Sequence, residues 1–338
     1  MLALVNALYQ HTDTLGHYAR ATFVDFSSAF NTMQLYKLIE KLKNLNVKRS
    51  LIAWIYNFLH ERIQKVKVND VLSDELVTNT GAPQGCVLSP SLFILYTNDC
   101  VSNDPSVHVL KYADDTVILG LINENENAYR EHIASFGMWC KDNHLVLNSK
   151  KTKEMIFDFR KKKDFEPHSS PIVFDGDPIE YVHSYRYLGT EIDDQLSWGE
   201  QTKTVSSKCN QRLYFLRKLK QFKVNEKILW LFYTSVLQSI ITHDSVIWFN
   251  NAKQKDLVKV HRVIKQSGKI TKHAVDLNEV CKDKVIDKAR SIITDDTHPL
   301  HNQYNMMRSG RRLKSIRART SRFLNSFVPY SIRLLNDL

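Results

Sequence analysis

The sequence predicts an α+β fold, with a sheet covered by helices on one face and a long helical region after it. Short apolar runs typical of strands alternate with amphipathic helical patterns through the first 160 residues. From about residue 200 the chain is helical and basic instead. With 338 residues, 43% of them hydrophobic, the chain can form more than one core.

Helices are expected at 1–17, about 33–44, 48–60, 90–101 and about 124–141. Strands are expected at 19–25, 63–68 and 154–159, and the acidic hairpin at 107–121. In the helix at 48–60, Leu51, Ile52, Ile55 and Leu59 share an apolar face. A second hairpin with an Asp-Gly turn is expected at 172–179.

Two adjacent acids occupy a tight turn between two apolar runs. Asp114 and Asp115 lie between Val107–Leu110 and Val117–Leu121, which are typical of the arms of a β-hairpin. Such a hairpin presents both carboxylates at its tip, where oxygen ligands suit hard cations such as Mg²⁺. Because Asp is also common in solvated turns, the pair alone would indicate only a turn.

A third acid, Asp25, follows the apolar run Ala21–Val24 and precedes a helical pattern. A lone carboxylate at the end of a buried strand costs several kcal/mol, on the order of 3–5 when one partner of a buried pair is missing. Two strand-end carboxylates from distant parts of a chain can bind two metal ions roughly 3.5–4 Å apart for phosphoryl transfer. The alternative is that Asp25, Ser27 or Ser28 caps the following helix.

A loop with two glycines and a proline, Gly81–Gly85, lies between these acids. Its composition allows the backbone to approach a ligand closely. Ser89 and Pro90 then favour the start of a helix, Ser89 as the cap and Pro90 as the first residue. The succession of acid, glycine loop and paired acids is more specific than any one of these features.

This succession resembles the reverse transcriptase family. The matching blocks are, in order, Phe23–Phe26 with Ala29 and Phe30, Gly81–Gly85, Tyr112–Asp115, Leu147–Thr152 and Tyr187–Gly189. Five blocks in the family's order and spacing are more than chance produces. The variant is similar to the polymerases of non-long-terminal-repeat (LINE-type) retrotransposons, and the run from Ser309 to Phe327 resembles the tail of those elements.

The resemblance implies catalytic roles for the acids and a lysine. Asp25 and Asp114 would be the metal ligands, with Asp115 beside them. Two Mg²⁺ ions, which Mn²⁺ could replace, would lower the pKa of the attacking primer hydroxyl and stabilise charge on the pyrophosphate leaving group. Lys151 aligns best with the lysine expected to protonate pyrophosphate, although the adjacent Lys150 is an alternative.

The resemblance also implies nucleotide-binding residues. Phe26 and Phe30 would lie at the incoming nucleotide. The ring of Phe30 would collide with a ribose 2′-hydroxyl and so favour deoxynucleotides, while ordinary core packing of this ring is an equal alternative. Gln84 and Gly85 would contact the template and the incoming nucleotide.

The architecture implied is a right-hand polymerase palm, an antiparallel sheet with helices packed on one face, followed by a helical thumb and a helical basic tail. Tyr187, Leu188 and Gly189 would position the primer terminus, or form a purely structural hairpin. The chain begins about two dozen residues before Asp25, so the fingers are expected to be largely missing from an N-terminally truncated member. The expected regions are the palm with a remnant of the fingers (1–160), a loop with hairpins and the primer grip (161–195), the thumb (196–250) and the C-terminal region (251–338).

Charge indicates the class of partner. The net charge is +11, which favours a polyanion. Basic residues gather in Arg160–Lys163, between Lys203 and Lys220, and between Arg308 and Arg322, a stretch without an acid. Many of them could be ordinary solvated surface, but basic groups spaced along one face suit a phosphate backbone. The expected partners are an RNA template, a DNA primer and deoxynucleoside triphosphates.

Cysteine usage and hydropathy indicate the compartment. Five scattered cysteines form no Cys-x-x-Cys pair, which argues against a zinc knuckle and a disulfide framework. No signal peptide is evident, and no run of eighteen or more apolar residues favours a membrane span. We expect an intracellular protein of the nucleus or cytoplasm, neither secreted nor bound to a membrane.

Three functional hypotheses follow. The first is an RNA-directed DNA polymerase that extends a primer with two Mg²⁺ ions. The second is a non-catalytic, nucleic-acid-binding remnant of a retrotransposon. The third is a fragment that does not fold alone, because palm surface is exposed. A group II intron maturase or a telomerase-like protein is disfavoured by the C-terminal match.

Overall fold

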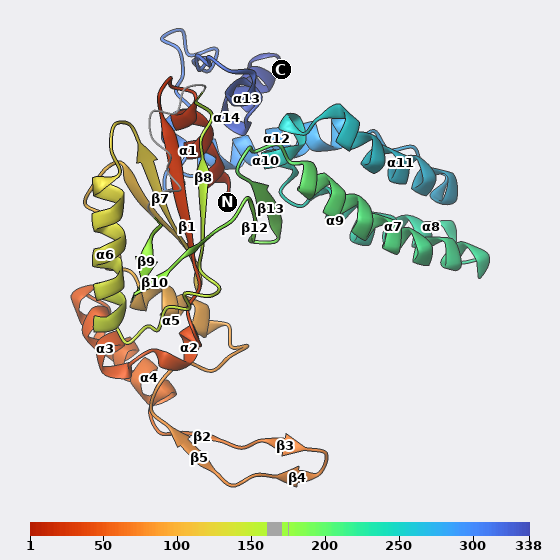
Figure 1. Cartoon of the computed structure of the whole chain (residues 1–338). Coiled ribbons are helices and arrows are strands. Elements are labelled where there is room, and N and C mark those ends of the chain that lie inside the picture. Colours follow the sequence, from red (N-terminus) through yellow and green to blue (C-terminus); the bar gives the residue numbers. More distant parts are fainter. Residues whose placement is uncertain (161–170, 175) are drawn as a thin grey trace. The chain divides into compact units, whose positions relative to one another are not determined.

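The computed structural model describes residues 1–160, 171–174 and 176–338. The chain divides into two compact units (Figure 1). The sheet unit comprises residues 19–156 and 162–182, and the helical unit comprises residues 1–18, 157–161 and 183–338. The basic run Lys161–Lys163 lies outside the described residues. The functional regions predicted with boundaries at 160, 195 and 250 stay predictions.

A five-stranded sheet with the order β11-β8-β1-β7-β6 forms the centre of the sheet unit. The strands are β1 (Tyr18–Val24), β6 (Val107–Tyr112), β7 (Asp115–Ile122), β8 (Lys153–Phe157) and β11 (Glu180–Tyr181). β6 and β7 form the predicted antiparallel hairpin. β11 pairs with β8 in parallel, so the sheet is mixed, and the expectation of a wholly antiparallel sheet was wrong. The connection over residues 158–179 is long enough for the crossover that parallel strands need.

The helices described in the sheet unit are α2 (Ala29–Thr32), α3 (Leu35–Asn44), α4 (Arg49–Leu59), α5 (Leu88–Tyr96) and α6 (Asn127–Asp142). The predictions for α3, α4 and α6 are confirmed. On α4, Ile52, Ile55 and Leu59 are buried as expected, whereas Leu51 is 47% exposed. The strand pairing of the hairpin predicted at 172–179 is confirmed as β9 (Val173–Phe174) paired with β10 (Asp177–Pro178). Asp175, of the predicted Asp-Gly turn, lies outside the described residues.

α5 begins and ends earlier than predicted, and Ser89 does not cap it. The buried Ser89 hydroxyl donates to the carbonyl of Pro83 at 2.6 Å, and Val87 occupies the cap position without a side-chain bond. At the other end of α5, the ammonium groups of Lys41 and Lys111 donate to the carbonyls of Tyr96 and Thr97 at 2.7 and 2.6 Å. Cations at a helix C-terminus satisfy its free carbonyls, so α5 ends there.

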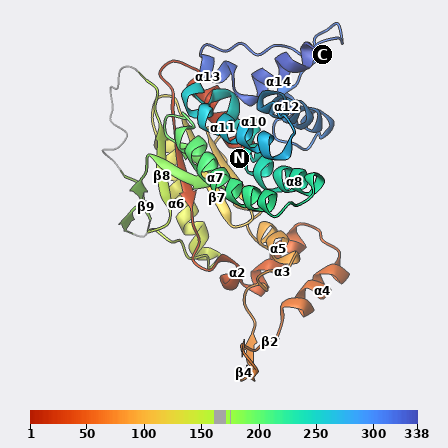
Figure 2. The ribbon, with the colours of Figure 1, turned by 90° about the vertical axis from the view of Figure 1, so that its right-hand side faces the viewer.

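A long hairpin replaces the single strand predicted at 63–68. Its strands are β2 (Arg62–Gln64), β3 (Lys67–Val68), β4 (Val71–Leu72) and β5 (Leu76–Thr78), with β2 paired to β5 and β3 paired to β4. It extends away from the rest of the sheet unit (Figures 1 and 2). Asn69 turns the chain with φ of 54°. The Asn-Asp dipeptide at 69–70 was the signal for this turn, because both residues tolerate the left-handed region.

A buried charge network joins three elements of the sheet unit. Arg20 on β1 donates two hydrogen bonds to Glu154 on β8, at 2.9 and 2.8 Å, and a third to Glu126 beside α6, at 2.6 Å. These three side chains are 1%, 2% and 7% exposed. The hydroxyl of Tyr129 on α6 donates to Glu154 at 3.2 Å. The network therefore fixes β1 against β8 and α6.

Glycine allows α6 to approach the sheet at the same place. A Cβ atom on Gly120 of β7 would lie 2.5 Å from the ring of Tyr129. No larger residue fits there unless the helix moves. The hydroxyl of Tyr129 also lies 2.6 Å from that of Thr22 on β1, so the ring crosses β7 and ends at the central strand.

The helical unit is built on pairs of helices. Its elements are α1 (Leu2–Thr12), β12 (Ser184–Tyr187), β13 (Thr190–Asp193), α7 (Gly199–Gln221), α8 (Glu226–Phe232), a π-helical turn η2 (Tyr233–Gln238), α9 (Ser239–Thr242), α10 (Ser245–Trp248), η3 (Phe249–Asn251), α11 (Gln254–Thr271), α12 (Leu277–Thr294), η4 (His301–Gln303), α13 (Ser321–Leu324) and α14 (Phe327–Asn336). α7 packs along α11 (Figure 1). None of the helices in the described ranges is long and apolar enough to cross a membrane.

The basic C-terminal region is folded onto the rest of the helical unit. Leu313 and Phe327 belong to one apolar cluster with α12 and α14. Asp13, after α1, accepts hydrogen bonds from the backbone of Arg319 at 2.7 Å and from the backbone and hydroxyl of Thr320 at 2.8 and 2.6 Å. The tail is therefore an integral part of this unit, although Arg308 and its basic neighbours are exposed.

We expect Arg20→Met to lower the free energy of unfolding by about 3–5 kcal/mol, because two buried carboxylates lose their main cation. Arg130→Met is the matched control. Arg130 pairs with the same Glu126 at 2.7 Å but is 32% exposed, so its loss should cost under about 1 kcal/mol. Guanidinium chloride unfolding measures the stability of both variants. Equal losses of unfolding free energy would contradict the inference that the Arg20 network fixes β1 in place.

Candidate active site

Asp25 directly follows β1, at the end of the central strand. Its side chain is half-buried, and its Oδ2 atom is buried without a hydrogen-bond partner in the described part of the chain. Buried polar atoms normally have partners, so such an atom calls for an explanation. A cation bound there would provide one.

The turn between β6 and β7 holds the other two acids. Tyr112 pairs with Asp115, so Ala113 and Asp114 form a two-residue loop. Ala113 has φ of 54°, a conformation that is uncommon for residues other than glycine and costs on the order of 1–3 kcal/mol. Such strain persists where the surrounding structure fixes it. Asp114 is thus held at an exposed tip, and Asp115 begins β7.

The three acids share one electrostatic environment. Partial burial raises the pKa of the Asp115 carboxyl, although the residue is exposed at the tip of the hairpin, and the negative charges of Asp114 and Asp25 raise it further. Among the described residues no group of three or more His, Cys, Asp or Glu side chains is placed to hold a metal ion, so the three acids do not form a ready-made metal site. Mg²⁺ characteristically binds one or two carboxylates plus substrate oxygens, so it needs no three-acid site. The mutual repulsion and the partnerless Oδ2 of Asp25 both fit a divalent cation.

The segment 146–152 docks on the strand end that carries Asp25. The backbone of Asn148 donates to the carbonyl of Asp25 at 2.9 Å, and the backbone of Asp25 donates to the hydroxyl of Thr152 at 3.2 Å. Phe26 and Leu147 form an isolated β-bridge. Lys151 follows these contacts and has an exposed side chain. The structure therefore brings the lysine-bearing segment to Asp25 but leaves the lysine itself in solvent.

The glycine loop packs on the residues that follow Asp25. The amides of Gly81 and Ala82 donate to the carbonyls of Met33 and Phe30, both at 2.7 Å. A Cβ atom on Gly81 would lie 2.5 Å from the Phe30 carbonyl oxygen. Gln84 is exposed, and its amide lies 3.5 Å from that of Asn31. The loop thus lies beside Phe30, as the predicted nucleotide site requires.

The two phenylalanines are half-buried and pack on α5. The ring of Phe93 lies 5.4 Å from that of Phe30 and 6.1 Å from that of Phe26, between centroids. Gly85 has φ of 76° with open space around its Cα. Phe30 therefore has a packing role whether or not it also contacts a nucleotide.

Tyr187, Leu188 and Gly189 belong to the helical unit, and their grouping with the acids stays a prediction. Leu188 and Gly189 form the loop of the β12–β13 hairpin, with φ of 47° and 87°. Tyr187 is 5% exposed. The sequence did not reveal that His243 supports this loop, with its Nε2 atom 3.3 Å from the carbonyl of Leu188.

Lys111 is another positioning residue that the sequence did not reveal. Its ammonium group donates to the carbonyls of Thr97 and Cys100 at 2.6 and 3.0 Å. β6 is thereby fixed to the end of α5 just before the acidic turn. Burial lowers the pKa of Lys111. The sequence signal that could have revealed this role is a lysine in the mostly apolar first arm of the acidic hairpin.

Residues 4–192 match the family model described as reverse transcriptase (RNA-dependent DNA polymerase). This range is more than half of the chain and includes the whole sheet unit. The chain belongs to the reverse transcriptase family. A second model, the N-terminal region of alkylated DNA repair protein alkB homolog 8, matches only residues 198–239 of this reverse transcriptase.

Curated relatives place this reverse transcriptase near the polymerases of non-long-terminal-repeat retrotransposons, which confirms the resemblance. It is 31% identical over 212 residues to a probable RNA-directed DNA polymerase from transposon BS of Drosophila melanogaster, a match covering 60% of this chain and 23% of the relative. It is 27% identical over 199 residues to the polymerase from mobile element jockey of the same species, covering 56% and 21%. The chain thus spans about a quarter of the length of these relatives.

A solved structure of telomerase from Candida tropicalis, in complex with a fragment of telomeric RNA, is also similar. The match has a TM-score of 0.41 and 12% sequence identity, and it covers 89% of this chain and 51% of the telomerase.

We expect Gly81→Ala to destabilise this reverse transcriptase by more than 2 kcal/mol, on the order of other steric insertions into packed sites. The new methyl group would strike the backbone of Phe30 and Asn31. Gly85→Ala is the matched control, because Gly85 shares the positive φ but has no neighbour within 4 Å of a Cβ position. Its cost should be about 1 kcal/mol. Urea unfolding compares the two, and equal costs would contradict the close approach.

Removal of the Asp115 charge should stabilise the metal-free protein. The raised pKa means that the fold binds a proton more tightly than the unfolded chain, so the ionised carboxylate destabilises the fold at neutral pH. In EDTA at pH 7 we expect Asp115→Asn to raise the Tm. The gain should fade as the pH falls through the raised pKa of Asp115 in the folded protein, and it should be absent below about 3.9, the unfolded-state value.

Added Mg²⁺ should raise the Tm of the wild type more than that of Asp115→Asn, since a ligand stabilises the state that binds it. Asp142→Asn, an exposed acid on α6, is the control and should alter neither response. A lower Tm of Asp115→Asn in EDTA would show that the three carboxylates do not repel one another.

Proposed function

We propose that this chain is the polymerase domain of a non-long-terminal-repeat retrotransposon and extends a DNA primer on an RNA template. The observation that carries the proposal is the buried Oδ2 atom of Asp25, which has no hydrogen-bond partner among the described residues. The charges of Asp25 and Asp114 also raise the pKa of the Asp115 carboxyl, which fits a cation near these acids. Family membership supports the reaction class. The mixed sheet with α6 on β6 and β7 supports a polymerase palm, and the α7–α11 pair supports a thumb.

Asp25 and Asp114 would hold the metal, with Asp115 beside them. When bound, two Mg²⁺ ions, or Mn²⁺ in their place, would supply Lewis-acid stabilisation of the primer hydroxyl and of the pyrophosphate leaving group. The chain's own contribution is to keep the carboxylates in place. The strained Ala113 turn holds Asp114, and the 146–152 segment holds Asp25.

The remaining residues would bind and orient the substrates. Lys151, exposed beside the strand end of Asp25, would donate a proton to the leaving pyrophosphate. Phe26 and Phe30 would lie under the incoming deoxynucleotide, and Gln84 and Gly85 would contact it and the template.

In the helical unit, Tyr187, Leu188 and Gly189 would position the primer end. The exposed basic residues of α7, among them Arg212 and Lys220, would bind the backbone of the duplex.

These basic residues also support a second candidate function, a non-catalytic nucleic-acid-binding remnant. They lie in the helical unit and need no metal. Binding by such a remnant would weaken steeply with salt and would not depend on Asp114.

Primer extension on an RNA template with Mg²⁺ tests the proposal. We expect extension by the wild type and a loss of at least about 100-fold in Asp114→Ala, because a metal ligand contributes several kcal/mol to the transition state. Asp142→Ala is the control for loss of one exposed acid and should retain activity. Salt-sensitive binding without extension by any variant would overturn the proposal in favour of the binding remnant. Absence of a cooperative unfolding transition would instead support a fragment that does not fold alone.

A further inference from the structure

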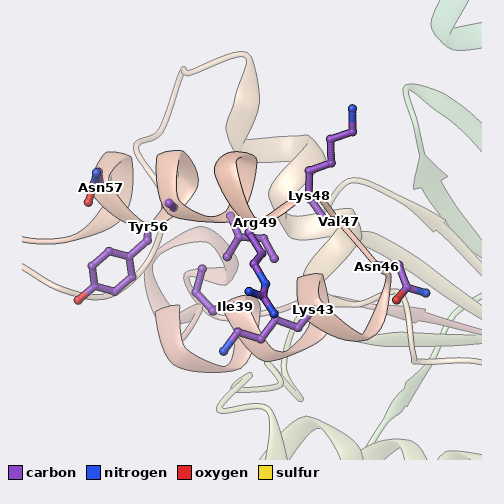
Figure 3. A pocket seen from close by; sticks show the side chains of 10 residues that line it. Ile39, Lys43, Asn46, Val47, Lys48, Arg49, Tyr56 and Asn57 are labelled. Carbon is purple, nitrogen blue, oxygen red and sulfur yellow. The ribbon is translucent and has the colours of Figure 1, made fainter.

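A basic cleft of about 910 Å³ opens between α3 and α4 of the sheet unit (Figure 3). Its cationic lining residues are Lys43, near the end of α3, Lys48, and Arg49, at the start of α4. Among the described residues that line the cleft there is no acid, and within that part of the chain the three cations form no ion pair. None of the predicted catalytic or nucleotide-binding residues lines it.

Two of the cations converge. Figure 3 shows Arg49 reaching down between the two helices toward the side of the cleft where Lys43 lies, whereas Lys48 extends away. Like charges brought together without a counter-ion repel each other, and an anion between them would convert repulsion into two charge-assisted hydrogen bonds. The planar fork of an arginine suits the oxygens of a phosphate in particular.

The other lining residues indicate what carries the phosphate. Tyr56 is exposed on the cleft wall and stacks on His60 with ring centroids 4.7 Å apart and an angle of 20°. Asn46 and Asn57 add amide groups, and aliphatic side chains complete the lining. A ring held flat beside a basic groove is a stacking platform for a base, and amides can bond to base edges. An acidic peptide would use only the cations, so the lining favours a nucleic acid strand whose bases are unpaired.

One wall of the cleft is the second half of α3, a helix whose first residue adjoins the glycine loop of the proposed active site. Gln34, the residue before α3, forms a β-bridge with Thr80, directly before the glycine loop. α3 therefore starts where the loop that carries Gln84 and Gly85 begins, and both lie in the sheet unit.

We propose that the α3–α4 cleft binds single-stranded RNA through its phosphodiester backbone and holds unpaired template. This inference rests on the proposed polymerase function and adds to it a strand-binding site outside the catalytic residues. Lys43 and Arg49 bind phosphate oxygens, and Tyr56 stacks on a base.

Fluorescence anisotropy with labelled oligouridine tests this site. An RNA of about 20 nucleotides exceeds the roughly 4–16 that single-strand sites cover, and EDTA in the buffer prevents catalysis. We expect the double variant Lys43→Ala/Arg49→Ala to weaken binding about 10-fold at 0.1 M salt. The slope of log K against log salt should fall by about 1.4, since each neutralised phosphate contributes about 0.7 for a single strand.

Matched variants separate charge from stacking. Lys37→Ala removes a cation from the same helix outside the cleft and should leave both affinity and slope unchanged. Lys48→Ala should have a smaller effect than Arg49→Ala, because Lys48 extends away (Figure 3). Tyr56→Leu should weaken binding at least about fivefold without changing the slope. All these side chains except Lys37 are exposed, so the unfolding midpoints of their variants should match the wild type.

Unchanged affinity and slope in the double variant would overturn the proposal. The proposal would also be overturned if a glutamate-rich peptide bound through Lys43 and Arg49 while RNA binding did not depend on them. The cleft would then be a site for a protein partner. Because the binding assay needs no catalysis, the proposal about the cleft can fail while the proposed polymerase function stands, and the reverse is also true. Cleft-dependent binding without primer extension would contradict only the polymerase function, and extension with cleft-independent binding would contradict only this site.

Discussion

The sheet unit depends on one buried guanidinium. Arg20 is 1% exposed and bridges Glu154 on β8 and Glu126 beside α6. In a low-dielectric interior three such groups are tolerated only when they are paired and hydrogen-bonded, and removing one partner leaves an uncompensated charge. The network therefore permits one arrangement of β1, β8 and α6. Since Asp25 directly follows β1, that arrangement also sets where the first predicted metal ligand lies.

Main-chain hydrogen bonds position the other segments of the candidate site relative to Asp25. Asp25 is held through its backbone by the 146–152 segment, and the glycine loop is held by the carbonyls of Met33 and Phe30. Backbone hydrogen bonds leave the side chains of Asp25 and Lys151 available for substrates. Rigid support beneath solvent-facing functional groups is what a site needs to orient reacting atoms.

Positive charge is distributed over both units. In the helical unit it lies on α7 and on a tail that is tied to α1 through Asp13. In the sheet unit it gathers in the α3–α4 cleft beside an aromatic wall. Charge spread along an exposed helix suits a regular duplex backbone, whereas charge in a cleft with a stacking ring suits an unpaired strand.

The sequence by itself determined the family, the acidic hairpin and the strand that ends at Asp25, because each depends on local pattern and on motif order. It also located α3, α4 and α6, whose apolar spacing reports burial directly. It could not show the parallel pairing of β11 with β8, because strand partners are set by long-range contacts. The start of α5 was wrong because Ser89 bonds to Pro83 and does not cap the helix. Only the tertiary structure decided that Arg20 is buried between two acids and that Lys43 and Arg49 line one cleft, since both facts join residues from separate elements.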